Sequence, residues 1–379
     1  MAWWQRRYIR EEETAARGGT YRLDLPDVGL LGSLLIRLEG TQAVDAHLAT
    51  EKGRMIDYVS DVKIIGNGIS VLKGLTGKQA QALSFYDQGV MPDTKWNTYA
   101  TASQKEYILL NFGRALFDRA MGLDLSTWDN VQLQIANNAS STYYGSDWSA
   151  TVLGYFLQEG ERFPLGYIKS EEFKSFSATA DTWEYSNLPT EGLLRRLILQ
   201  LEADMGDTYH EAETSMDNMG RDIKITLDSG AIVVYEGGVD DLMRDINLFM
   251  GRDVMVRQIV YRTQNYAQRN GLGRTFAVAS GALEIASDTV QDSGLTFDSD
   301  YDRATWAFAN AQGTTDQFAL GWGTCPHGQL WIPFTDDMDP TEWIDLAVRK
   351  TMKVDVHAYN TGGATGGACS IVLERLIRP

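Results

Sequence analysis

The sequence has few cysteines and no long apolar segment. Its two cysteines, Cys325 and Cys369, form no CxxC motif and no disulfide framework, so they fit a protein that folds in a reducing compartment. No purely apolar run approaches the roughly 20 residues that a transmembrane helix needs, and residues 1–13 lack the apolar core of a secretory signal. We therefore expect neither a membrane-spanning nor a disulfide-stapled protein.

Positive charge is also scarce. The chain has 34 Lys and Arg against 51 Asp and Glu, a net charge of −17, and such a surface repels nucleic acid and anionic membranes. We expect no sequence-specific nucleic-acid binding. The exception is a predicted N-terminal arm, residues 1–20, which places aromatic rings beside arginines: Trp3, Trp4, Arg6, Arg7 and Arg10. This composition is typical of a membrane–water interface, but an arm that packs on a neighbouring subunit explains it equally well.

Motifs for catalysis or metal binding are missing. The four histidines are scattered without metal-ligand spacing, and no GxSxG nucleophile elbow is present. Asp298, Asp300 and Asp302 have the alternate spacing of a calcium loop, but Arg303 and Ala309 stand where such a loop needs glycine and glutamate. A solvated acidic loop is the favoured interpretation, and cation binding there stays open. The sequence predicts no enzyme and no cofactor.

What the sequence does have is an internal repeat. Residues 25–39, LPDVGLLGSLLIRLE, return 163 residues later as LPTEGLLRRLILQLE at 188–202, with eight of fifteen positions identical. Further blocks match in the same order: 61–64 with 222–225, 107–112 with 328–334, 131–135 with 352–356, and 151–157 with 370–377. Matches that keep one order along the chain indicate a duplication.

The repeated blocks have the pattern of β-strands. Val131, Leu133 and Ile135 alternate with glutamines, and 352–356 alternates in the same way, as half-buried antiparallel strands do. Each half adds a helix-like segment, 78–88 and 239–250, and 239–270 is the most helix-like stretch of the chain. Many short strands in a duplicated chain favour an all-β fold of two tandem jelly rolls with a few short helices. We expect the first roll at 21–183 and the second at 184–379, with a long insertion at about 252–326.

These blocks resemble those of the double jelly-roll major capsid proteins of tailless icosahedral viruses, many with an internal membrane (the bacteriophage-to-adenovirus lineage). The resemblance spans Tyr21 to Pro379. It is carried by the Leu-Pro-x-x-Gly-Leu-Leu opening of each half, the apolar strand that ends in Phe112 or Phe334, and the alternating strand that follows. The segment 107–135 is especially similar to capsid proteins of small membrane-containing phages.

The resemblance implies a structural protein of the virion, assembled in the host cytoplasm. Three subunits would form a pseudo-hexagonal capsomer that tiles an icosahedral shell beside neighbouring capsomers. Minor capsid proteins and an internal viral membrane would be further partners, with the N-terminal arm facing inward to that membrane or to neighbouring subunits. The insertion would cover the outer top of the trimer, and its aromatic residues would line the trimer or tower interface: Tyr261, Tyr266, Phe276 and Trp306.

A second class of function stays open, a two-jelly-roll enzyme acting on glycans or a carbohydrate-binding protein. Its cleft would place acidic residues opposite aromatic walls, and the ten tryptophans are compatible with that arrangement. A bicupin would need clustered histidines and a carboxylate inside each barrel, which the sequence lacks. The capsid interpretation is favoured because of the resemblance and because the sequence offers no catalytic constellation.

Overall fold

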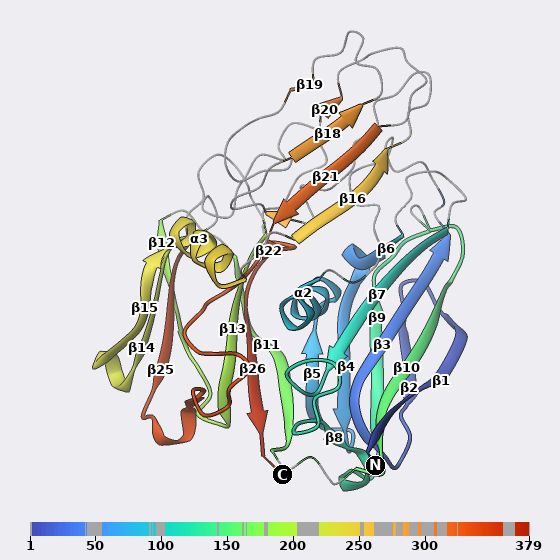
Figure 1. Cartoon of the computed structure of the whole chain (residues 1–379), viewed down its shortest axis with the longest axis horizontal. Coiled ribbons are helices and arrows are strands. Elements are labelled where there is room, and N and C mark those ends of the chain that lie inside the picture. The colour runs from blue at the N-terminus through green and yellow to red at the C-terminus, as the bar shows by residue number, and fades with distance from the viewer. Residues whose placement is uncertain are drawn as a thin grey trace.

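The computed structural model describes residues 2–41, 43, 55–90, 92, 94–95, 103–141, 144–160, 163, 165–177, 181–202, 220–250, 254–260, 276–277, 283–287, 295–296, 307–308, 317–323, 325–358 and 368–378. Two β-rolls lie side by side along the long axis of the molecule (Figure 1). Their strands run roughly upright, and both termini lie at the lower end in this view. The chain is therefore built from two similar units, one for each half of the repeat.

In the described residues, eight strands build the first roll. They form two facing sheets with the orders β1-β10-β3-β7 and β2-β9-β4-β5. Counted along the chain, these orders are 1-8-3-6 and 2-7-4-5, the interleaved Greek keys of a jelly roll. The strands are β1 (Trp3–Ala15), β2 (Thr20–Asp24), β3 (Leu30–Thr41), β4 (Val59–Gly66), β5 (Ser70–Leu75), β7 (Ser103–Asn111), β9 (Val131–Asn137) and β10 (Trp148–Gln158). Two short strands, β6 (Thr94–Lys95) and β8 (Leu123–Asp124), pair with β7 and β3.

The second roll repeats this topology. Its sheets have the orders β11-β26-β13-β23 and β12-β25-β14-β15, which again read 1-8-3-6 and 2-7-4-5. The strands are β11 (Tyr167–Ser177), β12 (Thr182–Asn187), β13 (Leu193–Glu202), β14 (Gly220–Leu227), β15 (Ile232–Gly238), β23 (Gln329–Trp331), β25 (Met352–Ala358) and β26 (Ala368–Ile377), with β24 (Ile344–Asp345) beside β13. The predicted fold class, all-β with two tandem jelly rolls, is confirmed.

The strand pairing corrects two of the predicted boundaries. β11 and β12 pair with β26 and β25 and so belong to the second roll, whereas the predicted limit between 183 and 184 would have left β11 in the first roll and divided β12. β1 lies within the predicted arm of residues 1–20, yet it pairs with β10 from Trp3 to Ala15 as the first strand of the first roll. These strands were missed because most of their side chains are polar or exposed, so a buried face leaves little trace in the sequence.

Helices and short helical turns complete each roll. α2 (Gly77–Gln88) and α3 (Val239–Met250) follow the fifth strand of their rolls, and both confirm the predicted helices. The expectation of helix-like structure as far as residue 270 is wrong at β16 (Val254–Val260), whose β-branched residues favour a strand. The short 3-10 turns are η1 (Met55–Tyr58), η2 (Leu125–Thr127), η4 (Asp228–Gly230) and η5 (Leu346–Val348).

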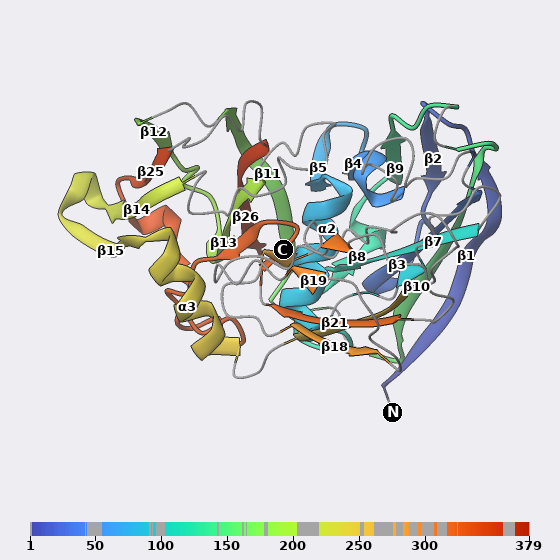
Figure 2. The same ribbon diagram turned by 90° about the horizontal axis from the view of Figure 1, so that it is seen from above.

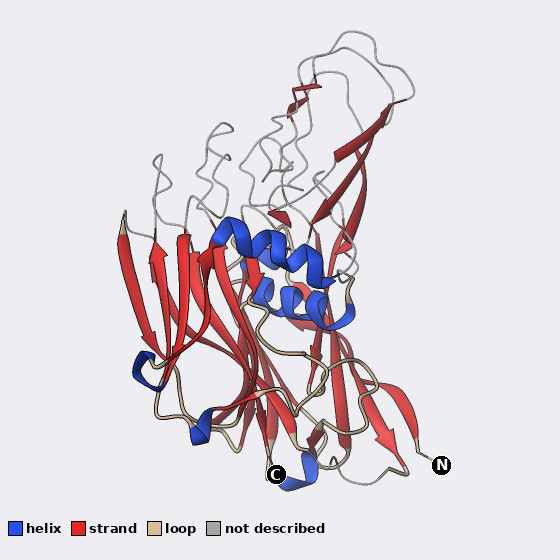
Figure 3. Cartoon of the chain, turned by 60° about the vertical axis from the view of Figure 1, so that its left-hand side comes forward, coloured by secondary structure: helices blue, strands red, loops and turns tan. Residues whose placement is uncertain are grey.

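The insertion lies between α3 and β23. Its described strands are β16, β17 (Phe276–Ala277), β18 (Leu283–Ser287), β19 (Leu295–Thr296), β20 (Ala307–Phe308), β21 (Gln317–Gly323) and β22 (Cys325–Pro326). β16, β21 and β18 form a sheet of their own, at the end of the molecule opposite the termini (Figures 1 and 3). Among the described residues, no helix is long and apolar enough to cross a membrane.

β-bulges recur at matching positions of the two rolls. A bulge inserts one extra residue into a strand and locally re-aims its side chains. The extra residues are Gly32 in β3 and Arg195 in β13, Leu72 in β5 and Val234 in β15, and Ile9 in β1 and Phe173 in β11. A fourth pair is Ser60 in β4 and Arg221 in β14. Irregularities shared at four places support the duplication, and they match the two rolls residue by residue.

Candidate functional site: the junction between the two rolls

The two rolls share one continuous sheet. β5 of the first roll pairs in parallel with β11 of the second, with Lys73 opposite Ser170 and Gly74 opposite Glu171. The second sheet of the first roll and the first sheet of the second roll therefore join, in the order β2-β9-β4-β5-β11-β26-β13-β23. Because backbone hydrogen bonds cross this contact, the two rolls are held in a fixed relation.

α2 fills the space beside this shared sheet. It begins at Thr76 with a capping box, in which the Thr76 side chain accepts from the backbone of Gln79 and the Gln79 side chain accepts from the backbone of Thr76. One face of the helix binds its own roll: Gln81 Nε2 donates to the carbonyl oxygen of Tyr107 at 3.0 Å, and Ser84 Oγ donates to that of Leu109 at 2.6 Å. These bonds explain why a helix with so many polar residues is buried.

The opposite face of α2 binds the second roll. Gln79 Nε2 donates to Gln200 Oε1 at 3.0 Å and to Ser370 Oγ at 2.9 Å. The Tyr86 hydroxyl donates to the carbonyl oxygen of Gln329 at 2.9 Å, and its ring lies 6.1 Å from that of Trp331. The helix thus belongs to the first roll and ties it to the second.

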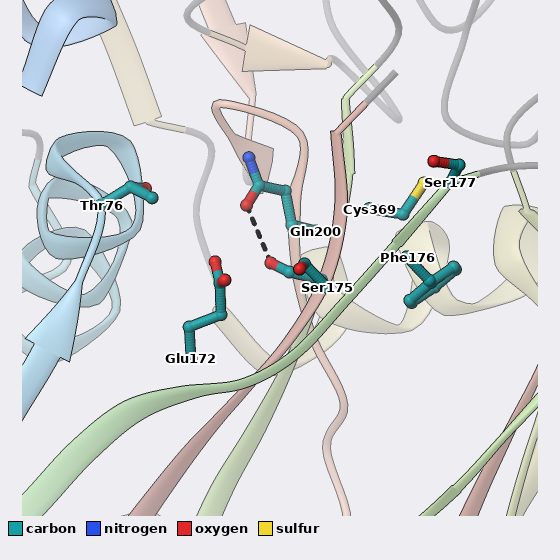
Figure 4. Close-up of a pocket in the computed structure, with 8 residues that line it drawn as sticks. Thr76, Glu172, Ser175, Phe176, Ser177, Gln200 and Cys369 are labelled. Atoms are coloured by element: carbon teal, nitrogen blue, oxygen red, sulfur yellow. Dashed lines mark hydrogen bonds between the residues drawn. The ribbon is translucent and has the colours of Figure 1, made fainter. Parts of the chain in front are cut away.

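A pocket of about 370 Å³ opens beside these contacts (Figure 4). Its one carboxylate, Glu172, already accepts a hydrogen bond from Gln79, and Ser370 donates to Gln200 at 3.0 Å. The rest of the lining consists of hydroxyls, the Phe176 ring and the buried thiol of Cys369. No second acid faces Glu172 across the pocket lining, so the arrangement is a hydrogen-bonding joint and offers no acid–base pair.

Next to this network lies a buried cluster of charges. Arg195 and Arg196 of β13 are adjacent in sequence, but the bulge lets both reach the same two carboxylates. Nη1 of Arg195 lies 2.9 Å from Oδ1 of Asp87, at the end of α2, and 3.2 Å from Oε2 of Glu374, in β26. Nη1 of Arg196 lies 3.0 Å from each of the same two oxygens. Arg196 also binds Asp337, at 2.8 Å from its Nε. The arginines of one roll therefore bind the helix of the other.

Lys73 completes the cluster from the first roll. Its Nζ donates to Ser170 Oγ at 2.8 Å, and Ser170 donates to Glu374 Oε1 at 2.8 Å. Three basic side chains thus meet three acidic ones, and all but Asp337 are at most 5% exposed. A buried charge of either sign is costly unless it is paired, and here the signs balance.

The environment of the cluster shifts the pKa of its members in different directions. Burial lowers the pKa of Lys73 to about 8, against the attraction of Glu374 and Asp87. Burial would raise the pKa of Glu374, but Arg196, Arg195 and Lys73 hold it below its usual value. Glu374 is therefore ionised at neutral pH, while Lys73 is close to losing its proton.

The sequence carried one trace of this cluster. Within the best-matched block of the repeat, Arg195 and Arg196 stand where the first half has Gly32 and Ser33. Two arginines inside an otherwise apolar strand are unusual unless they are paired, so the substitution could have indicated a buried ionic contact. Their partners Asp87 and Glu374 could not have been predicted, because no pattern in the sequence links these two carboxylates to the arginines.

The aromatic and basic residues near the N-terminus all lie on β1. The Trp4 ring packs over Gly32 and lies 5.8 Å from the Phe117 ring, and the Arg7 guanidinium lies 4.2 Å from the centre of the Phe156 ring. Trp3, Arg6, Arg7 and Arg10 are exposed, with Arg10 3.3 Å from Glu13. The strand thus presents part of the predicted set to solvent and uses the rest to pack its own sheet.

The other predicted site residues lie in the insertion. Tyr261, Tyr266, Trp306, Asp298, Asp300 and Asp302 are outside the described residues, and Phe276 is described only as a backbone position of β17. Among the described residues, no group of three or more His, Cys, Asp or Glu side chains is arranged to hold a metal ion.

Comparison with solved structures identifies the fold. The major capsid protein of Sulfolobus turreted icosahedral virus is 9% identical and aligns over 99% of this chain and 97% of its own, with a TM-score of 0.61. The major capsid protein of bacteriophage PM2 is 7% identical, with 98% and 96% aligned and a TM-score of 0.52. A capsid model of the virus PBCV-1 is 10% identical, with 99% of this chain and 93% of its own aligned and a TM-score of 0.53.

These similarities cover nearly the whole of each chain, so the chain shares the double jelly-roll fold of these capsid proteins. At such low identity the likeness is one of fold. No family model matches the sequence, and neither does any curated protein.

Proposed function

We propose that this chain is the major capsid protein of a virus, and that three copies form a pseudo-hexagonal capsomer of an icosahedral shell. The observation that carries the proposal is the alignment of both rolls and the insertion, over almost the full chain, with capsid proteins of the same fold. The proposed location is the virion, with assembly in the host cytoplasm. Neighbouring capsomers, minor capsid proteins and an internal viral membrane are the proposed partners.

The junction between the rolls supports a structural role. A shell subunit needs its two rolls in one fixed orientation. A hinge between them would let their relative orientation vary, and with it the geometry of every contact in the lattice. The parallel β5–β11 pairing, the α2 bridge and the neutral buried cluster together supply that fixed orientation. One described pocket is lined by three acidic residues, Asp61, Glu171 and Glu172. Each already has a partner: Asp61 pairs with Lys63, Glu171 pairs with Lys169 and Arg375, and Glu172 accepts from Gln79. This pocket therefore gives little support to the glycan-active alternative.

For the N-terminal residues we favour contact with a neighbouring subunit over contact with a membrane. β1 is paired along its length with β10, so it cannot leave the roll to reach a bilayer without breaking the sheet. Its exposed residues lie on the edge of that sheet, where a second protein chain could bind them. We propose that this edge faces a neighbouring subunit in the shell.

The mass of the purified protein tests the proposed assembly. Size-exclusion chromatography with light scattering should give about three times 42.2 kDa, and negative-stain images should show hexagonal outlines. A monomer at high protein concentration, without hexagonal particles, would contradict the proposal, and glycan-array binding by that monomer would favour the alternative.

A further inference from the structure

Two strands at the far ends of the molecule match two strands that pair at its centre. β15 is the fifth strand of the second roll, as β5 is of the first, and β1 is the first strand of the first roll, as β11 is of the second. β5 and β11 pair in parallel at the junction. In the described part of the chain, β15 and β1 each end a sheet, and they lie at opposite ends of the molecule (Figures 1 and 2).

The shared bulges match these strands residue by residue. Counted from its bulge, Tyr235 of β15 matches Lys73 of β5, and Arg6 of β1 matches Ser170 of β11. Lys73 and Ser170 are opposite one another and hydrogen-bonded at 2.8 Å. A second contact of the same kind would therefore bring Arg6 of one copy beside Tyr235 of another.

The helices extend the match. Each helix begins five residues after the bulge of the preceding strand, so Gln79 and Tyr86 of α2 match Asp241 and Leu248 of α3. Tyr86 is 8% exposed because it inserts between the rolls, whereas Leu248 is 79% exposed. The face of α3 that corresponds to the junction face of α2 thus carries an exposed leucine and an exposed carboxylate.

The surface that would receive α3 lies on the first roll. Gln79 of α2 binds Gln200 and Ser370, and the aligned strands match these residues with Arg37 and Thr151. The two members of each pair are hydrogen-bonded, but with the donor exchanged: Arg37 donates to Thr151 at 3.1 Å, whereas Ser370 donates to Gln200 at 3.0 Å. Arg37 also forms an ion pair of 3.2 Å with Glu12 of its own chain. The local arrangement at the junction is therefore repeated on the outside of the first roll.

We propose that β15 and α3 of one copy bind β1 and β3 of the next, in the arrangement that β5 and α2 have with β11 and β13 inside the chain. Asp241 would then face Arg37 of the next copy, and Leu248 would be buried. The inference rests on the proposed capsomer and specifies its contact. Such a head-to-tail contact closes into a ring when the rotation permits, and three copies would place six rolls around one axis.

The chemistry of the two ends is complementary. The first part of β1 carries the exposed cations Arg6, Arg7 and Arg10, ahead of Glu11, Glu12 and Glu13, whereas α3 begins with Asp240 and Asp241. Both ends also expose large apolar side chains, which favour association when water is excluded. These are Trp3 and Tyr8 on β1, and Ile232 and Val233 on β15.

A charge placed at Leu248 tests the apolar part of the contact. Leu248→Asp should raise the concentration at which the trimer dissociates by roughly tenfold or more, with the melting temperature of the monomer unchanged because the side chain is exposed. Val348→Asp is the matched control, since Val348 is 72% exposed and lies on η5 near the opposite end of the roll. It should leave the trimer intact.

An exchange of charges tests the pairing itself. Asp241→Arg and Arg37→Asp should each weaken the trimer, and the double variant should restore it at least in part. Mixing the two single variants should form mixed oligomers more readily than either forms alone, because each mixed contact can pair opposite charges. Circular dichroism of every variant identifies any that fails to fold.

The outcomes separate this contact from the proposed function. Trimers that Leu248→Asp and both charge reversals leave unchanged would overturn the contact and leave the capsomer standing. A wild-type chain that stays monomeric would overturn both. Loss of trimer with Leu248→Asp but not with Val348→Asp, together with rescue by the exchanged pair, would establish the contact.

Discussion

Arg196 of β13 lies directly opposite Glu374 of β26, and their side chains form an ion pair of 3.0 Å that is almost completely buried. The matching residues of the first roll, Ser33 and Tyr155, are also opposite each other, but Ser33 binds the neighbouring Asn111 instead. Two duplicated strands therefore carry different chemistry at one position. The charged version occurs where the second roll meets the first, so we attribute it to the junction and not to the jelly roll itself.

Breaking this pair should strongly destabilise the chain. Arg196→Ala leaves Glu374, Asp87 and Asp337 short of one cation in a buried site, which costs about 3–5 kcal/mol of unfolding free energy in comparable buried pairs. The control is Arg349→Ala, which removes a partly exposed pair with Asp228 and should cost about 0–1 kcal/mol. Urea unfolding measures both. Equal, small losses would mean that the cluster is not buried as described.

Stability should rise with pH around the titration of Lys73. Its pKa is lowered to about 8 in the folded chain, against about 10.4 in an unfolded one. Between these values the unfolded chain holds a proton that the folded chain has released, so the unfolding free energy increases with pH. The increase is fully developed above the unfolded pKa and is lost as the pH falls through about 8.

A comparison with Lys73→Met isolates this contribution from the other groups that titrate in the same range. The unfolding free energy of the wild type minus that of the variant should rise across pH 8 to 10, with a slope of at most about 1.4 kcal/mol per pH unit. A difference that stays flat, or falls, would show that Lys73 keeps its proton in the folded chain.

The duplication was predictable because core-facing residues constrain the sequence. Leu34, Ile36 and Leu38 are fully buried in β3, and their matches in β13 keep apolar side chains, so the blocks stay recognisable. β1 and β11 are different. Across residues 5–10 and 169–174 no position is identical, and of these residues only Ile9 and Phe173 pack against the main core. One side chain against the core in each of these segments is too weak a constraint to preserve a readable pattern.

The junction was not predictable for a related reason. Lys73 and Asp87 lie on consecutive elements of the first roll, but Arg195 and Arg196 lie about a hundred residues further along and Glu374 lies on the last strand of the second roll. Each is an ordinary residue in its own segment. Only the strand order brings them together. The bulge at Arg195 also reverses the alternation on which face assignments depend, so both arginines bind where a regular strand would present only one.

Glycines in the sheets seat aromatic rings, and filling one should destabilise its roll. A Cβ at Gly66 would lie 2.3 Å from Cε3 of Trp128. Gly66→Ala should therefore cost about 1–3 kcal/mol, as overpacked cores do. Gly145→Ala is the control, because the nearest atom to its Cβ would be 3.7 Å away. Thermal unfolding of the two variants measures the difference, and equal melting temperatures would contradict the close packing of Trp128.

The most direct test of the account is an image of the assembled oligomer by electron cryomicroscopy. The account predicts six jelly rolls around one axis, contributed by three chains, with β15 and α3 of each chain against β1 and β3 of the next. A ring in which the rolls alternate but meet through other strands would contradict the proposed contact. Particles with any other number of rolls, or single chains only, would contradict the capsomer.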